Sequence, residues 1–322
     1  MRDHVVVDAA AAAAAVAAAL RSCTHLPAGK VFHDHIIRHS LDHCRSLTNL
    51  LLRMYANCSA LHEARDVHSK APKQQCDAMS WNLICAAHAR NNLLQDALRY
   101  MGMMLQEGLY RPNKVTLVSI LSASASKNRS LIAGKLVHFL LIENGFFEKD
   151  VVLGTAIINM YGKCGSLDDA RHVFEELDGR DEITWNSIIS IYARTEEFQL
   201  MALEFLFRME HEGILADKAT FVNLFSSFSG NEILLPQGKR LHAVVNETGL
   251  HADLIVATAI LNMYCKSGLL EYMHNIFDRF SNHDTFSWNT LIGAYARHGQ
   301  RSKAIQLFEK MQRGGTKPDK IS

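Results

Sequence analysis

The sequence is poor in the residues that would indicate a disulfide framework, a zinc site or a β-rich fold. Its 322 residues include five prolines and seven cysteines, an odd number, spread along the chain without a Cys-x-x-Cys pair. Neither a disulfide framework nor a zinc site is therefore indicated, and a reducing compartment is expected. Aromatic residues make up 8% of the chain and do not dominate its periodic segments, which favours helices over many short strands.

An excess of charge of either sign is also missing. Lys and Arg number 34 and Asp and Glu 33, so the chain lacks the global positive field that accompanies non-specific nucleic-acid binding. The alanine tract over residues 9–19 is too short and too weakly apolar to predict a membrane span. The N-terminus carries Asp3 and Asp8, with Arg2 as its one arginine before the tract, and this is not the Arg- and Ser-rich, acid-poor pattern of a transit peptide.

What the sequence does contain is a long internal period. Each tryptophan begins a Trp-Asn dipeptide, and two other motifs, Met-Tyr and Gly-Lys-x-x-His, also occur three times. The tryptophans, the tyrosines and the first glycines of these motifs are Trp81, Trp185, Trp288, Tyr55, Tyr161, Tyr264, Gly29, Gly134 and Gly238. Within each set, neighbouring copies lie 103 to 106 residues apart. This spacing predicts a superrepeat of about 104 residues, divided into three units of roughly 35 residues.

Each unit has the pattern of a helical hairpin. Apolar residues recur with helical spacing over residues 287–297 and again over 303–311. Gly299 lies between these segments and Gly314 follows them, where helix ends commonly need a left-handed residue. One hairpin cannot bury its apolar face alone, so neighbouring hairpins must stack. We therefore predict an all-α fold, a right-handed α-solenoid of stacked helix-turn-helix repeats, with about nine repeats.

The motifs distinguish between two families of such arrays. Ser-Trp-Asn-Thr-Leu-Ile from Ser287, followed by Tyr-Ala-Arg-His-Gly and by Lys-Pro-Asp ending at Asp319, resembles the standard repeat of plant pentatricopeptide repeat proteins. Residues 159–171 are similar to the short repeat of that family, and the Gly-Lys-x-x-His segments resemble its long repeat. The order long, short, standard resembles the PLS subfamily, and the chain shows no C-terminal deaminase motif.

The resemblance implies a full set of repeat boundaries. They are an alanine-rich N-terminal segment 1–14, then long repeats 15–44, 114–150 and 218–253, short repeats 45–77, 151–181 and 254–284, standard repeats 78–113, 182–217 and 285–319, and the start of a further repeat at 320–322. The first triplet departs from the pattern, because its long repeat is shortened and its short repeat has Asn-Cys-Ser at 57–59 where Lys-Cys-Gly is usual.

The resemblance also implies how RNA would be read. One repeat meets one base, and the fifth residue of its first helix acts with the last residue of the repeat. Carried over, the pairs are Asn49 with Asp77, Asn82 with Asn113, Thr155 with Asp181, Asn186 with Asp217, Thr258 with Asp284, and Asn289 with Asp319. Val118 and Val222 occupy the fifth position of two long repeats and offer no hydrogen bond. By the code of the family, Asn with Asp selects U, Asn with Asn selects C and Thr with Asp selects G, which gives the core 5′-U-C-n-G-U-n-G-U-3′. We expect the fifth-position side chains to line one shared groove.

Two further sets of residues follow from the resemblance. The second residue of a repeat wedges between bases, which points to Met79, Val152, Ile183, Ile255 and Phe286. Eight residues beyond the fifth position, about 80° away around the helix, stand five cations that would face phosphates. These are Arg90, Lys163, Arg194, Lys266 and Arg297.

Structural interpretations of the same residues remain open. Asp and Asn are preferred helix N-caps, which explains acids at repeat ends without RNA. Lys and Arg near a helix C-terminus interact favourably with the helix dipole. The tryptophans and Met-Tyr pairs are expected to pack in the core, and the recurring histidines to occupy helical repeat positions without holding a metal. What distinguishes base reading from capping is the alternation of Asn, Thr and Val at the fifth position.

The predicted function is sequence-specific binding of single-stranded RNA. Editing members of the family carry a zinc-dependent deaminase that needs His-x-Glu and Cys-x-x-Cys, and neither spacing occurs here. We therefore predict a protein that is not an enzyme and has no cofactor. It would direct C-to-U editing or other processing of mitochondrial or chloroplast RNA, with partner proteins supplying the deaminase. A protein-binding scaffold of the tetratricopeptide type is the alternative.

Overall fold

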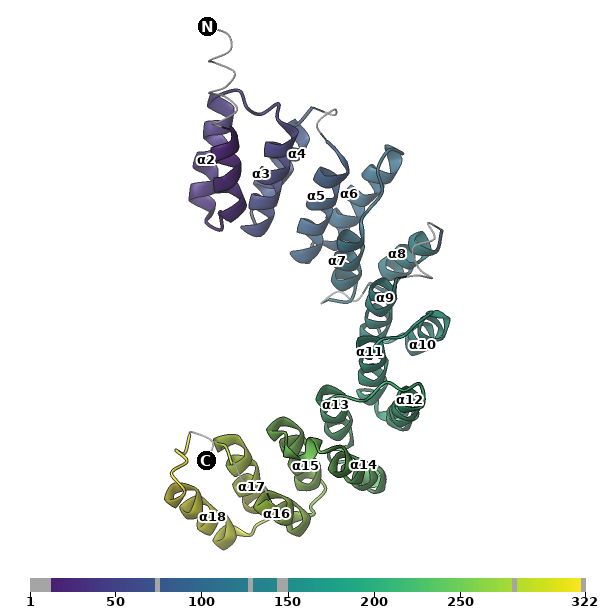
Figure 1. Ribbon diagram of the computed structural model, residues 1–322, viewed down its shortest axis with the longest axis vertical. Helices are drawn as coiled ribbons and strands as arrows, with labels where there is room; N and C mark the ends of the chain where they lie inside the picture. Colours follow the sequence, from purple (N-terminus) through teal and green to yellow (C-terminus); the bar gives the residue numbers. More distant parts are fainter. Residues whose placement is uncertain (1–12, 73–75, 127–129, 144–149, 280–282, 320–322) are drawn as a thin grey trace. The chain divides into compact units, whose positions relative to one another are not determined.

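The computed structural model is built from paired α-helices (Figure 1). The structure describes residues 13–72, 76–126, 130–143, 150–279 and 283–319. Within these ranges the regular elements are α-helices and short 3-10 helices, with no strand. The chain divides into two compact units, Met1–Asp178 and Gly179–Ser322, and each is considered by itself. The predicted all-α fold of stacked helical hairpins is confirmed, while its right-handedness stays a prediction. Most of the alanine-rich segment 1–14 and all of residues 320–322 lie outside the described residues.

The first unit begins with a helical segment over residues 13–22. Its further helices are α2 (Leu26–Arg38), α3 (Arg45–Asn57), α4 (Leu61–Lys70), α5 (Ala78–Arg90), α6 (Leu94–Gln106), α7 (Lys114–Ser124), α8 (Leu131–Glu143), α9 (Val151–Lys163) and α10 (Leu167–Glu176). Helix α3 packs on α5, α5 on α7, and α7 on α9, so the first helices of successive hairpins form one layer. The second helices α4, α6, α8 and α10 pack against their own first helices.

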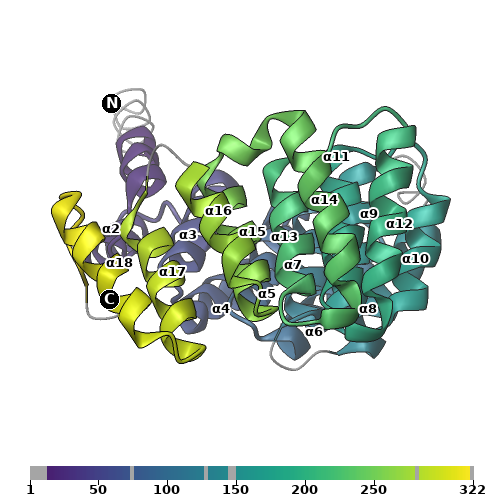
Figure 2. The ribbon, with the colours of Figure 1, turned by 90° about the horizontal axis from the view of Figure 1, so that it is seen from below.

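The second unit repeats this arrangement, which Figure 2 shows for α13, α15 and α17. Its elements are α11 (Glu182–Ala193), η1 (Glu196–Phe198), α12 (Gln199–His211), α13 (Lys218–Phe228), η2 (Glu232–Leu234), α14 (Leu235–Thr248), η3 (Leu250–Ala252), α15 (Leu254–Lys266), α16 (Leu270–Arg279), α17 (Thr285–Arg297) and α18 (Arg301–Arg313). The layer of first helices consists here of α11, α13, α15 and α17, each packed on the next.

Acidic and amide side chains begin most of the first helices. In each case the side-chain oxygen accepts a hydrogen bond from a backbone N–H of the first turn, which is the N-cap geometry. The capping residues are Asp77, Asn113, Asp150, Asp181, Asp217, Asp253 and Asp284. Loss of one such cap typically costs about 0.5–2 kcal/mol. The capping interpretation therefore holds for this column, and it does not exclude a second role.

The turn between the two helices of several hairpins contains a left-handed residue. Gly165, Gly268 and Gly299 take this conformation, with φ of 80°, 73° and 74°. In the first triplet the equivalent residues are Ser59 and Asn92, with φ of 54° and 60°. A serine in this region costs more than glycine because its Cβ crowds the backbone. The departure from the usual motif at residues 57–59 is therefore accommodated at an energetic cost, without a change of turn.

The three tryptophans lie in the core, where Trp185 contacts its own second helix α12 and the other two contact the second helix of the preceding hairpin. Trp81, Trp185 and Trp288 are 4%, 0% and 5% exposed, as expected for packing residues. Tyr55, Tyr161 and Tyr264 of the Met-Tyr pairs are equally buried. These residues pack the hairpins together. Because they are buried, other side chains form the exposed edge of the first-helix layer.

The Gly-Lys-x-x-His motif is explained by its contact with the Met-Tyr pair of the following helix. We call this contact the Gly-His junction, which joins α2 to α3, α8 to α9, and α14 to α15. A Cβ added to any of the three glycines would overlap the methionine sulfur that lies against it. The contacting residues are Gly29 with Met54, Gly134 with Met160, and Gly238 with Met263. A larger residue at these positions would require the buried methionine side chain to shift.

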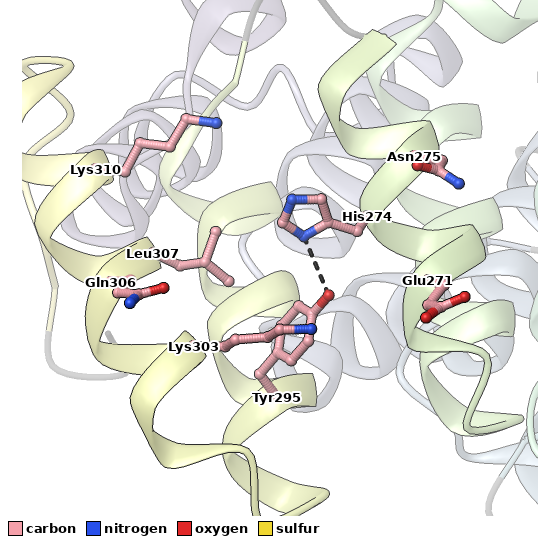
Figure 3. Close-up of a pocket in the computed structure, with 8 residues that line it drawn as sticks. All are labelled: Glu271, His274, Asn275, Tyr295, Lys303, Gln306, Leu307 and Lys310. Carbon is pink, nitrogen blue, oxygen red and sulfur yellow. Dashed lines mark hydrogen bonds between the residues drawn. The ribbon is translucent and has the colours of Figure 1, made fainter.

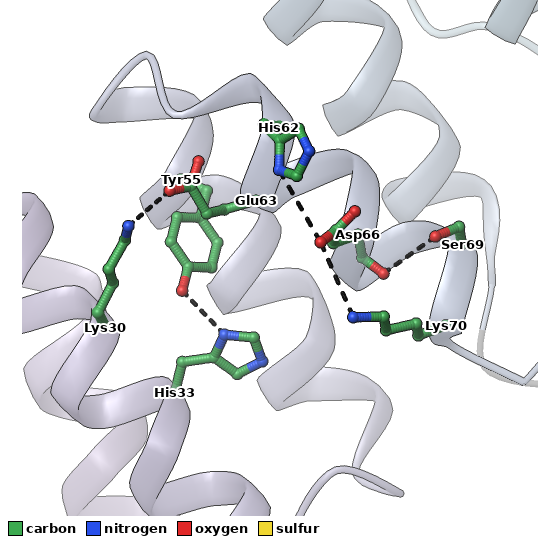
Figure 4. A network of polar contacts seen from close by, with 8 residues as sticks. All are labelled: Lys30, His33, Tyr55, His62, Glu63, Asp66, Ser69 and Lys70. Carbon is green, nitrogen blue, oxygen red and sulfur yellow. Dashed lines mark hydrogen bonds and ion pairs between the residues drawn. The ribbon is translucent and has the colours of Figure 1, made fainter.

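The histidine and lysine of the motif complete the Gly-His junction (Figure 4). His33 Nδ1 lies 2.8 Å from the hydroxyl of Tyr55, and the other two junctions have the same pair at 2.9 and 3.1 Å. Lys30 forms an ion pair of 2.7 Å with Glu63, and the second junction has its counterpart at 2.8 Å. In the third junction Lys239 Nζ lies 4.7 Å from the ring centre of Tyr272. The histidines of the motif thus have a structural role.

Candidate nucleic-acid interface

Three of the predicted base-reading pairs are in direct side-chain contact. Asn186 Nδ2 donates to Asp217 Oδ1 at 3.2 Å, and Asn289 Nδ2 donates to Asp319 Oδ1 at 2.9 Å. Asn49 Nδ2 lies 3.3 and 3.2 Å from the two carboxylate oxygens of Asp77. For Asn49 and Asn186, the fifth residue of one first helix therefore reaches the residue that caps the next first helix.

The pair of Asn82 and Asn113 is arranged differently. The backbone N–H of Asn113 donates to Asn82 Oδ1 at 2.8 Å. Asn82 Nδ2 donates to the carbonyl of Ala78 in its own helix, at 2.6 Å. Because Asn113 offers no carboxylate, the amide of Asn82 turns its nitrogen away from it. An Asn with Asn pair thus presents its amide in a different orientation from an Asn with Asp pair.

The pair of Thr258 and Asp284 lacks the direct contact seen for asparagine, and the pair of Thr155 and Asp181 spans the two units. Thr258 Oγ1 donates to the carbonyl of Leu254 at 2.7 Å, and Asp284 accepts from the backbone N–H of Ser287 at 2.8 Å. Threonine is one atom shorter than asparagine, so its hydroxyl bonds to its own helix. Thr155 belongs to the first unit, whereas Asp181, which caps α11, belongs to the second.

The expectation that all fifth-position side chains line an open groove is wrong for the first unit. Asn49, Asn82 and Thr155 are 7%, 7% and 8% exposed, which makes them buried. In the second unit Asn186 and its counterparts on α15 and α17 are partly exposed. For Asn49 and Asn82 the burial has a physical cause, because each lies between adjacent first helices and contacts the residue that caps the next helix. The amide oxygen of Asn49 is buried there without a hydrogen-bond partner.

The second position of the first helices carries exposed apolar side chains. All five predicted wedge residues are at least half exposed, namely Met79 (51%), Val152 (52%), Ile183 (67%), Ile255 (57%) and Phe286 (57%). Val115, the second residue of α7, is 64% exposed and belongs to the same set. Sequence reasoning missed it, although its spacing from Val118 would have identified it. Exposed apolar residues at one repeated helix position are not explained by core packing.

The five predicted phosphate-contacting residues are all exposed. They lie at the C-terminal ends of α5, α9, α11, α15 and α17. Arg90 Nε donates to the carbonyl of Ala86 at 3.3 Å, and Arg297 Nη2 lies 3.1 Å from the Cys265 sulfur. The contact of Arg90 with its own helix supports the helix-dipole interpretation, yet the charged groups still face solvent.

A cavity of the second unit lies away from these residues. It has a volume of about 480 Å³ between α16, α17 and α18, and Figure 3 shows its lining. His274 Nδ1 lies 3.1 Å from the Tyr295 hydroxyl at its wall. The charges of its lining are mixed, since Glu271 faces it along with Lys303 and Lys310. None of the predicted RNA-contacting residues lines this cavity.

The described part of the chain lacks a metal-binding cluster and a membrane-spanning helix. No group of three or more His, Cys, Asp and Glu side chains there is arranged to hold a metal ion. Among the same residues, no helix is both long enough and apolar enough to cross a bilayer.

Comparison with known protein families gives matches along the chain. The family described as "PPR repeat" matches residues 79–109, 155–181, 183–214 and 255–283, and the "PPR repeat family" matches residues 283–322. These matches cover both units.

Relatives of known name come from Arabidopsis thaliana. A mitochondrial pentatricopeptide repeat-containing protein is 34% identical over 306 residues, covering 94% of this chain and 47% of the relative. A chloroplastic one is 31% identical over 296 residues, covering 91% of this chain and 36% of the relative. The chain thus spans about half or less of the length of these relatives.

Solved structures show the same fold. The crystal structure of the pentatricopeptide repeat protein PPR10 from maize matches with a TM-score of 0.69 at 18% identity, covering 92% of this chain and 42% of that one. PPR10 in complex with an 18-nt psaJ RNA element matches with a TM-score of 0.63, covering 92% of this chain and 44% of that one.

Proposed function

We propose, from the premise that this chain belongs to the PPR repeat family, that it binds single-stranded RNA sequence-specifically, one repeat to one base. The observation that carries the proposal is the recurring contact between a fifth-position asparagine and the aspartate at the end of the same repeat. The contact recurs at the same point of three hairpins, those that begin with α3, α11 and α17. PPR10, which has the same fold, has been solved in complex with an RNA element, and this supports the proposal of RNA binding.

The asparagine amide retains hydrogen-bonding capacity after its protein contacts are made. Asn186 uses one N–H for Asp217 and one lone pair of its oxygen for the Thr220 hydroxyl. One N–H and one lone pair therefore remain for the edge of a base. Uracil offers an N–H donor beside a carbonyl acceptor, which complements this pair of groups. We propose that Asn186 and Asn289, each with its aspartate, select U.

The apolar second positions would separate successive bases. Base stacking on an aromatic side chain contributes about 1–3 kcal/mol and tolerates any sequence. Phe286 is the one aromatic member of the set, so we expect it to contribute more than Ile183 or Val152. The five cations at the helix C-termini would hold the phosphates. The near-neutral net charge of the chain does not prevent this, because salt screens a phosphate from protein charges that lie more than roughly 8–10 Å away.

The burial of Asn49 and Asn82 changes what is expected of the first unit. A base reaches these amides only if the covering cap residue moves or the hairpins separate slightly, and both cost free energy. We therefore propose that the first two bases of the core, U and C, are selected less strictly than the bases read by α11, α15 and α17. The unpartnered oxygen of Asn49 is an acceptor that the N–H of uracil would satisfy.

The target would be an organellar transcript, and the chain itself not an enzyme. Relatives named mitochondrial and chloroplastic support a site of action in one of these organelles. We propose that binding directs C-to-U editing of a nearby cytidine, with partner proteins supplying the deaminase, or another step of RNA processing. The predicted PLS order of repeats is part of this proposal.

A second candidate function, a protein-binding scaffold, is favoured by one specific observation. Helix α8 exposes an apolar stripe of Ile132 (85%), Leu136 (49%), Phe139 (57%) and Ile142 (51%). A contiguous exposed apolar stripe of this kind often marks a contact with another protein. The stripe lies on a second helix, outside the layer that carries the base-reading pairs, so protein binding there is compatible with RNA binding.

A titration separates the two functions. Labelled RNA containing 5′-U-C-n-G-U-n-G-U-3′ and an RNA of the same composition in scrambled order are each titrated with the protein at a fixed salt concentration. The proposal predicts at least tenfold tighter binding of the core, equivalent to about 1.4 kcal/mol. Equal affinity for both RNAs, or binding of neither, would remove the specific reader and favour the scaffold.

A further inference from the structure

The third residue of a first helix lies against the base-reading pair of the preceding hairpin. We infer that the Thr220 hydroxyl is a positioning group for base recognition, because it fixes which end of the Asn186 amide meets the base. Where this hydroxyl reaches the amide oxygen, as it does at Thr220, it would thereby set the preference for U over C of the repeat before it. This inference rests on the proposed function and extends it to a residue outside the predicted pairs.

The contacts of Thr220 hold both ends of the neighbouring pair. Thr220 is fully buried, and its backbone N–H donates to Asp217 Oδ1 at 2.8 Å. Its hydroxyl lies 2.8 Å from the same carboxylate oxygen and is hydrogen-bonded to Asn186 Oδ1. The single hydroxyl proton lies between the Asp217 carboxylate and the Asn186 amide oxygen, so the hydroxyl is held against both members of the pair. The amide nitrogen is thus held by Asp217 and the amide oxygen by Thr220.

The orientation of this amide decides between the two pyrimidines. Uracil presents an N–H at the position where cytosine presents a bare ring nitrogen, so uracil needs the amide oxygen and cytosine the amide nitrogen. When both ends of the amide are held, the flipped orientation suited to cytosine is excluded. When the hydroxyl is missing, only the nitrogen end is held and the amide rotates more freely.

The equivalent residues elsewhere in the chain support a link between the third position and the preceding selector. Thr116, which follows Asn82, donates through its hydroxyl to the backbone carbonyl of that asparagine at 3.2 Å. After Val118, which offers no hydrogen bond to a base, the third residue of the next first helix is Leu153. After Val222 it is Val256. A polar third residue therefore follows asparagine, and an apolar one follows valine.

Serine at this position does not replace threonine. The hydroxyl of Ser80 turns to the carbonyl of Asp77 at 2.8 Å, and that of Ser287 to the carbonyl of Asp284 at 2.9 Å. The preceding selector of Ser80 is Asn49, whose amide oxygen is buried without a partner. Threonine is stiffer because it is branched at Cβ, which restricts its rotamers. The amide oxygen is satisfied in Asn186, which is followed by Thr220, and unsatisfied in Asn49, which is followed by Ser80.

The test compares affinities for core RNAs that carry either U or C at the fifth base, which is assigned to Asn186. Thr220→Val keeps the shape and removes the hydroxyl, and it is expected to lower the preference for U over C about three- to tenfold, the range set by one hydrogen bond. Thr116→Val is the matched control, because it also removes a buried hydroxyl but one that binds a backbone carbonyl. Its preference at the second base should stay within about twofold of the wild-type value.

The outcomes separate this inference from the proposed function. If the wild-type protein prefers U at the fifth base and Thr220→Val prefers it as strongly, the inference is overturned and the proposed function stands. A wild-type protein without any preference there overturns both. Should Thr220→Val not fold, Ser80→Thr provides the reciprocal test. It is expected to raise the preference for U over C at the first base about three- to tenfold, and an unchanged preference would overturn the inference.

Discussion

Gly134 of α8 lies directly against the sulfur of Met160 in α9. A Cβ at residue 134 would come well within 3.0 Å of that sulfur, closer than real Cβ atoms approach a neighbour. The same relation recurs at the two other Gly-His junctions. The glycine of the repeated motif is therefore required by helix packing, since its φ is helical and needs no special backbone freedom.

Gly134→Ala is expected to destabilise the protein although alanine is the better helix former. Overpacking typically costs about 1–3 kcal/mol, which exceeds the gain of about 0.5–1 kcal/mol from helix propensity. Gly102→Ala is the matched control, because residue 102 lies inside α6 with nothing within 4 Å of its would-be Cβ. Urea unfolding followed by circular dichroism should show opposite shifts of the midpoint. Equal stabilisation by both alanines would contradict the packing account.

Acidification is expected to weaken the Gly-His junctions. Burial lowers the pKa of His138, although Glu176 and Asp169 oppose this and His172 adds to it. The folded protein therefore keeps this ring neutral while the unfolded chain takes up a proton as the pH falls through about 6.5. The contribution to stability is present above that pH and lost below it. Burial likewise lowers the pKa values of His33 and His242.

His138→Asn provides the measurement for this prediction. The asparagine oxygen still accepts from the Tyr161 hydroxyl in place of the ring nitrogen but does not titrate. Free energies of unfolding are compared between pH 7.5 and pH 5.5 for both proteins. The variant should lose less stability over this interval than the wild type. An identical loss would show that His138 does not contribute to the pH dependence.

The salt dependence of RNA affinity distinguishes two roles of the basic residues at the helix ends, contact with phosphates and interaction with the helix dipole. Lys163→Gln should reduce the slope of log affinity against log salt by about 0.7, the value for one phosphate contact of a single strand. Arg171→Gln, on the exposed face of the second helix α10, should leave the slope unchanged. If Lys163 serves only the helix dipole, its variant loses about 0.3–1 kcal/mol of stability and keeps the wild-type slope.

The sequence was sufficient to predict the hairpins, because their signals are local. Helix spacing, the capping acids and the glycine turns each depend on a few neighbouring residues, and Trp81, Trp185 and Trp288 gave the period. The spacing specified the position of each candidate residue in its helix. It did not specify whether the side chain is buried, since the residues that cover Asn49 and Asn82 belong to the next hairpin.

The orientation of polar groups also lay beyond sequence reasoning. Ser80 and Thr220 occupy the same repeat position and both carry a hydroxyl, yet their hydroxyls bind different partners. The difference depends on a rotamer and on the distance to a neighbouring helix. For the same reason the histidines of Gly-Lys-x-x-His were expected to be structural, but their tyrosine partners were not identified.

The most direct test of base reading is to change one capping residue of a base-reading pair. Asp217→Asn keeps the N-cap of α13, because asparagine and aspartate cap equally well, and makes the pair resemble Asn82 with Asn113. Asp253→Asn, which changes the cap of α15 behind the silent Val222, is the control. Affinities are measured for core RNAs with U or C at the fifth base. The account predicts that Asp217→Asn reverses the preference from U to C while Asp253→Asn retains it. An unchanged preference for U in Asp217→Asn would contradict one-repeat, one-base recognition.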